Sequence, residues 1–96
     1  MKIIMDISIV CKSVAGEHAF LRKEFESDII PIPGMFIEDT AWKKPRKPAE
    51  ITCNFDGQYY HVQFEDVEIQ KPDALEREAE MYRGHGWKSP SEWGLH

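Results

Sequence analysis

The stretch from Ile51 to Phe64 constrains the fold most strongly, because a turn signal separates two runs of alternating apolar and polar residues. The Asp-Gly pair at 56–57 is typical of a two-residue type I′ turn, which joins antiparallel strands in a tight hairpin. This turn pairs residue 53 with 60 and residue 51 with 62. One face of the hairpin is then apolar and points to a core: Ile51, Cys53, Phe55, Tyr60 and Val62. The other face is polar and points outward: Thr52, Asn54, Tyr59, His61 and Gln63.

The hairpin strands, at about 50–55 and 58–65, are joined by up to three further predicted strands. Residues 2–12 have apolar side chains at alternate positions: Ile3, Met5, Ile7, Ile9 and Cys11. Residues 19–27 fit two structures, because the spacing of Leu21 and Phe25 agrees with one face of a helix and also with one phase of a strand. We interpret 19–27 as a strand, since the first strand needs a hydrogen-bonded neighbour. Residues 35–39 are a candidate short strand.

Two segments between the predicted strands lack any periodicity. Residues 29–34 read "IIPIPG", and their two prolines and one glycine exclude a helix and a central strand, so we expect an extended crossing that turns at Gly34. Residues 40–50, "TAWKKPRKPAE", contain two more prolines and four basic residues, and they predict an exposed loop.

The end of the chain predicts one helix and a tail. Pro72 suits a first helical turn, Asp73 and Glu76 suit the positive end of the helix dipole, and Arg83 suits the negative end, so we expect a helix at about 72–83. Residues 84–96 form a tryptophan-containing tail, in which "SPSE" at 89–92 is typical of a single helical turn capped by its serine.

These elements predict a mainly β (α+β) fold in one domain of about 96 residues, with the globular part at 1–83 and the tail at 84–96. Four or five short strands and one C-terminal helix are typical of a small, curved antiparallel sheet, closed or half-closed like an SH3-like or OB-type barrel. This likeness concerns architecture alone and implies no function.

A cytoplasmic location is expected. The apolar N-terminal run resembles a signal peptide, but Asp6 and Ser8 interrupt it and the alternation continues through it. No stretch approaches the roughly 20 apolar residues that span a bilayer. Cys11 and Cys53 are too few for a disulfide framework and have no CxxC spacing, as expected of reduced thiols.

The motifs of catalysis and metal binding are missing from the sequence. Four scattered histidines form no HxxxH or HExxH pair: His18, His61, His85 and His96. A cysteine–histidine nucleophile fails, because both cysteines fall on buried faces while His61 points outward. We therefore predict no metal, no cofactor and no catalytic residue, and we interpret the 17 acidic residues as solvated surface charge.

Three surfaces could instead bind a partner. The first is the loop at 42–47, in which a tryptophan lies beside four cations: Trp42, Lys43, Lys44, Arg46 and Lys47. The alternative interpretation is that these charged residues only make the loop soluble. The second is the outer hairpin face with Tyr59 and His61, although antiparallel sheets ordinarily show one polar face to water. The third is the tail with Trp87 and Trp93, two indoles that either fold back on the domain or contact a partner.

The leading hypothesis is a non-catalytic protein-interaction module with an unknown protein partner. Single-stranded nucleic-acid binding through the 42–47 loop and the barrel face is an alternative, but the net charge of −5 disfavours it because such binding depends on neutralising phosphates. An enzyme of unrecognised type is a second alternative. A homodimer through an edge strand is compatible with the sequence, which does not specify one.

Overall fold

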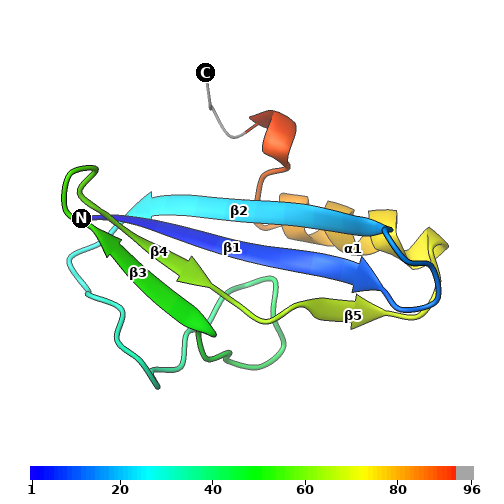
Figure 1. Cartoon of the computed structure of the whole chain (residues 1–96), viewed down its shortest axis with the longest axis horizontal. Coiled ribbons are helices and arrows are strands. Elements are labelled where there is room, and N and C mark those ends of the chain that lie inside the picture. Colours follow the sequence, from blue (N-terminus) through cyan, green and yellow to red (C-terminus); the bar gives the residue numbers. More distant parts are fainter. Residues whose placement is uncertain (93–96) are drawn as a thin grey trace.

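The computed structural model describes residues 1–92 and has five strands in one open, mixed sheet (Figure 1). The elements in chain order are β1 (Lys2–Cys11), β2 (His18–Glu26), β3 (Glu50–Asn54), β4 (Tyr59–Gln63), β5 (Val67–Ile69), α1 (Asp73–Gly84) and a single 3₁₀ turn, η1 (Pro90–Glu92). The predicted mainly β class with one C-terminal helix is confirmed. The sheet is not closed into a barrel, and no helix among residues 1–92 is long and apolar enough to cross a membrane.

The strand order β2-β1-β4-β3 makes part of the sheet parallel, where a wholly antiparallel sheet was predicted. β2 runs antiparallel to β1, whereas β4 and then β5 run parallel to it, along its other edge. The reason lies in residues 27–49, which are long enough for the crossover that parallel neighbours require. They carry the chain past β1, so that β4, and not β3, pairs with it.

β2 confirms the strand interpretation of the ambiguous segment, because it pairs with β1 from Lys2–Glu26 to Val10–His18. Residues 35–39, in contrast, are not a strand. Only one isolated bridge, between Ile37 and Arg46, occurs there. Continuing this pairing outward would place Met35 opposite Pro48, which has no N–H to donate, so the ladder cannot extend.

The hairpin register is as predicted, with Ile51 opposite Val62 and Cys53 opposite Tyr60. The turn is longer than predicted: it spans four residues, 55–58, and the residue with positive φ is Gln58 (56°). Phe55 therefore leaves the ladder and is 84% exposed, so its predicted place in the core is wrong. The Asn54 side chain accepts a hydrogen bond from the Gly57 N–H (2.7 Å), which stabilises this loop and was not anticipated.

The core lies on one face of the sheet, where the alternate apolar side chains of β1 meet those of β2 and β4. α1 contributes Ala79 and Tyr82, each 1% exposed, and the chain then returns so that Trp87 is equally buried. Figure 1 shows α1 packed along β1 and β2 on one side of the sheet. The long segment 27–49 contributes three partly buried residues to the same core, Ile37, Ala41 and Trp42.

Candidate binding surface

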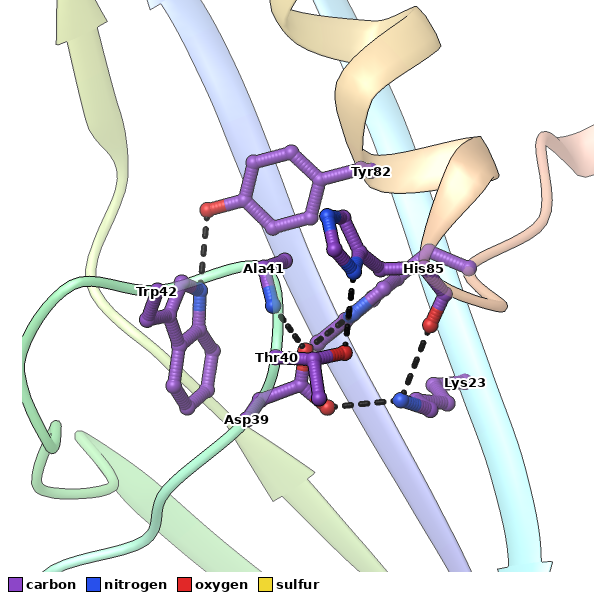
Figure 2. Close-up of polar contacts among 8 residues, drawn as sticks. Lys23, Asp39, Thr40, Ala41, Trp42, Tyr82 and His85 are labelled. Carbon is purple, nitrogen blue, oxygen red and sulfur yellow. Dashed lines mark hydrogen bonds and ion pairs between the residues drawn. The ribbon is translucent and has the colours of Figure 1, made fainter.

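Asp39 fixes the middle of the segment between β2 and β3 to the rest of the domain. Its carboxylate accepts hydrogen bonds from Lys23 Nζ (2.7 Å), Trp87 Nε1 (3.0 Å) and the Ala41 N–H (2.9 Å). Figure 2 shows Lys23 between Asp39 and the carbonyl of His85, which it also contacts at 3.0 Å. Burial raises the pKa of Asp39, but the bonds from Lys23 and Trp87 outweigh it and hold the pKa below its usual value.

Trp42 is a second anchor of this segment. Its indole N–H donates to the Tyr82 hydroxyl at 2.9 Å (Figure 2). Its ring packs edge-on against Phe64, with 4.8 Å between centroids, and lies 5.8 Å from the ring of Trp87. The Arg46 guanidinium covers the ring at 5.3 Å. Trp42 therefore connects the segment to α1 and the core, and its ring is largely occupied by the chain itself.

The residues at 37–47 form a basic loop closed by the Ile37–Arg46 bridge, whose two backbone hydrogen bonds measure 2.8 and 2.9 Å. Lys43, Lys44 and Lys47 are exposed and Arg46 is half-buried. None of these four cations has an ion-pair partner among residues 1–92, and neither do Lys71 and Arg77. Five cations elsewhere in the domain do: Lys2, Lys12, Arg22, Lys23 and Arg83. A cavity of about 490 Å³ lies beside Lys43 and Lys44.

An apolar segment at 29–36 precedes the basic loop and was not anticipated from the sequence as a candidate binding element. Its four large apolar side chains are mostly exposed: Ile29 71%, Ile30 54%, Ile32 55% and Phe36 64%. The signal for it was the apolar composition of a proline-containing stretch that fits neither a helix nor a central strand, and so has no regular way to bury its side chains.

Between this apolar segment and the core face lies an apolar groove of about 270 Å³. Its floor is formed by Ile3, Met5 and Phe25 of the sheet, and its rim by residues from both sides of Gly34, including Met35 and Phe36. Lys47 Nζ lies 5.0 Å from the centre of the Phe36 ring. The apolar groove and the basic loop are therefore neighbours and form one continuous surface.

The outer hairpin face carries a charged cluster of three residues on adjacent strands. Arg22 of β2 donates two hydrogen bonds to Asp6 of β1 (2.7 and 2.8 Å), and His61 Nε2 of β4 lies 2.5 Å from the same carboxylate. Burial raises the pKa of Asp6, yet the contacts with Arg22 and His61 lower it further than burial raises it. Tyr59 is half-buried, and its hydroxyl accepts a bond from Asn54 (3.2 Å).

This outer cluster satisfies its charges internally. Asp6 and Arg22 were not anticipated as partners of His61; an aspartate inside the apolar run "IIMDISI" was the available signal. The two cysteines are free thiols. Tyr60 of β4 pairs with Cys53 of β3 on one side and with Ile3 of β1 on the other, so Cys53 lies level with Ile3 in the sheet. Cys11 lies eight residues beyond Ile3 along β1, so the two cysteines are roughly 26 Å apart along the strand direction.

The fold brings two of the three predicted binding tryptophans, Trp42 and Trp87, together beside the core. Trp42 is half-buried, and Trp87 is a core residue whose ring meets Tyr82 edge-on at 5.4 Å. Trp93 lies outside the described residues. Within residues 1–92, no three histidine, cysteine, aspartate or glutamate side chains are grouped so as to hold a metal ion.

The chain matches no protein-family model, and comparison with curated proteins and with solved structures found no match either. Support for a role of this surface therefore comes only from its own geometry, apolar exposure and charge.

Proposed function

We propose that this chain is a non-catalytic protein-interaction module that binds its partner through the apolar segment at 29–36 and the adjoining groove. The observation that carries this proposal is the exposure of four large apolar side chains within eight residues: Ile29, Ile30, Ile32 and Phe36. Such residues are normal on a surface when they are scattered. Four of them within one short segment, two of which (Ile29 and Phe36) line a groove, are typical of a protein-interaction site.

The size of the effect can be estimated from the exposed fractions. Fully burying one such side chain contributes about 1.5–3 kcal/mol, so covering the exposed parts of all four would contribute roughly 4–7 kcal/mol. Association costs about 4–15 kcal/mol in lost translational and rotational freedom. The apolar segment alone would therefore support weak binding, and a specific partner must also use neighbouring groups, of which the basic loop is the nearest.

Single-stranded nucleic acid is less well supported as a ligand. The four unpaired cations of the basic loop favour it, but base stacking needs an open aromatic face, and Trp42 is covered by Arg46 and packed on Phe64. The net charge of −5 also opposes association with phosphates. We place the module in the cytoplasm, where the free thiols of Cys11 and Cys53 would stay reduced.

The test is a comparison of three purified proteins: the wild type, an Ile32→Ser/Phe36→Ser variant, and a Phe55→Ser control. Phe55 is the same residue type as Phe36 and even more exposed, but it lies in the hairpin turn and does not line the groove. Each protein serves as bait in quantitative affinity capture, and any recovered protein is purified and titrated against all three by calorimetry.

We expect binding to the wild type and to Phe55→Ser with equal affinity, and at least a tenfold loss with the double variant. The sites are exposed, so circular dichroism and urea unfolding should show all three folded alike. Equal binding by all three proteins, or loss with Phe55→Ser alone, would contradict a role for the 29–36 segment.

A further inference from the structure

We infer that the partner contributes an acidic polypeptide segment with one large apolar anchor residue, and that the anchor enters the groove while the carboxylates lie against the basic loop. This inference rests on the proposed function and adds the chemistry of the partner to it. It combines two neighbouring features: the apolar groove, which has Phe36 on its rim, and the basic loop, whose Lys47 lies over the Phe36 ring.

The charge of the basic loop is left uncompensated within the domain. The chain has 17 acidic residues and only 12 lysines and arginines, so an internal acidic partner for every cation is available in principle. Elsewhere such pairs form; Arg83, for example, binds both Glu76 and Glu80. The four cations of the basic loop form no ion pair within residues 1–92, although like charges placed this close together repel one another.

Two acidic side chains lie near the basic loop without pairing with it. Glu38 lines the 490 Å³ cavity together with Lys43 and Lys44, and Glu65 lines a cavity of about 400 Å³ with Arg46 and Lys47. Neither glutamate comes within ion-pair distance of these cations. Asp39 also lines the first cavity, but its charge is paired with Lys23. The remaining local balance of four cations and two carboxylates is positive, so the loop favours an anionic partner even in an acidic protein.

The surface is held in place before any partner arrives. Asp39, bonded to Lys23 and Trp87, and Trp42, bonded to Tyr82, attach the basic loop to the core. The Ile37–Arg46 bridge then sets the loop against the groove, because Ile37 lines the groove and Arg46 belongs to the loop. A preformed site avoids the entropy cost of ordering a loop on binding.

The groove is suited to a side-chain anchor. Its volume of about 270 Å³ lies below the roughly 300–1,000 Å³ of pockets that enclose an organic ligand. Its Phe, Met, Ile and Pro lining matches a phenylalanine, tryptophan, leucine or isoleucine, the kind of residue that contributes most at the centre of an interface. The rim charges would chiefly accelerate association and select against basic partners.

The experiment selects random 12-residue peptides displayed on phage against the immobilised full chain, and then measures the synthetic peptides by fluorescence anisotropy. Three variants are compared with the wild type: Phe36→Ser removes the rim of the groove, Lys43→Glu/Lys47→Glu reverses the loop charge, and Phe55→Ser is the matched control. Each titration is made at 0.05 M and 0.5 M NaCl. A fluorescein-labelled thymidine 20-mer and light scattering of the chain alone complete the design.

We expect enriched peptides to combine a net negative charge with one large apolar residue. Their affinity should fall at least tenfold with Phe36→Ser and severalfold with Lys43→Glu/Lys47→Glu, remain unchanged with Phe55→Ser, and weaken severalfold at the higher salt concentration, which screens surface charge. Solvent-exposed substitutions of this kind leave the fold intact.

Neutral or basic peptides that depend on Phe36 would overturn this inference while leaving the proposed function standing. If no peptide depends on Phe36, both fail. Tight binding of the thymidine 20-mer that is lost with Lys43→Glu/Lys47→Glu would assign the loop to nucleic acid instead. Self-association that disappears with Phe36→Ser would assign the groove to a second copy of this chain.

Discussion

Replacing Asp39 by alanine should destabilise the domain more than any other single change on its surface segments. The carboxylate is 5% exposed and accepts three hydrogen bonds, from Lys23, Trp87 and the Ala41 N–H. All three bonds have an ionised acceptor, and a bond to a charged group contributes about 1.5–3 kcal/mol. Lys23 is one-quarter exposed and would regain water, so its share lies at the lower end.

Taking the lower end for all three bonds, the expected loss for Asp39→Ala is about 4.5 kcal/mol, which corresponds to roughly 18–36 °C in the midpoint of thermal unfolding for a domain of this size. Part of it arises because the indole N–H of Trp87, a residue 1% exposed, would keep no acceptor. Asp39→Asn should lose about half as much, since its carbonyl oxygen can still accept a bond from Trp87 or Ala41.

Urea unfolding followed by tryptophan fluorescence measures this loss, with Glu38→Ala as the control. Glu38 is the exposed neighbour and has no ion pair within residues 1–92, so its removal should change stability by less than about 0.5 kcal/mol. The pKa of Asp39 is lowered in the folded state, so its contribution is present above the unfolded pKa of about 3.9 and disappears as the pH falls through the folded pKa. Equal losses for Asp39→Ala and Glu38→Ala would refute the anchoring role.

Two further predictions concern the sheet. Asp6→Asn should cost about 1–3 kcal/mol at pH 7 by weakening the contacts with Arg22 and His61, and the deficit should shrink below about pH 4, because the pKa of Asp6 is lowered by folding; urea titrations from pH 3 to pH 7 measure it. Phe55→Ser should change stability by less than about 0.5 kcal/mol, whereas Ile9→Ala, at a site with no exposure, should cost about 2–5 kcal/mol, as thermal unfolding will show.

The hairpin shows what local sequence can predict. Its register follows from alternation over a few residues, and the structure reproduces it. The turn was predicted wrongly because Asp-Gly is only one of several signals there. Asn54 caps a longer loop with its side chain, and Gln58 takes the left-handed conformation. Gly57 is needed for a different reason: a Cβ there would lie 2.5 Å from the Tyr59 ring.

Non-local pairing explains the other points at which the sequence alone was ambiguous or differed from the structure. Leu21 and Phe25 fit a helix and a strand equally well in sequence, and the ten-residue edge of β1 selects the strand. The parallel pairing of β4 and β5 with β1 depends on the path that residues 27–49 take across the sheet. The sequence of this segment has no periodicity that would predict that path. Likewise, Asp39 contacts Lys23 and Trp87, which are 16 and 48 positions away, so no spacing rule identifies the cluster.

The backbone of the apolar segment opposes indiscriminate association through strand pairing. Exposed apolar residues on a regular edge strand would invite pairing with other chains through free backbone groups. Pro31 and Pro33 alternate with the exposed Ile30 and Ile32, and neither proline has an N–H to donate to a ladder. The segment therefore presents side chains without offering a continuous backbone template. Under the proposed function, recognition at this site would depend on side-chain fit and on the charge of the neighbouring loop, and both can discriminate between partners.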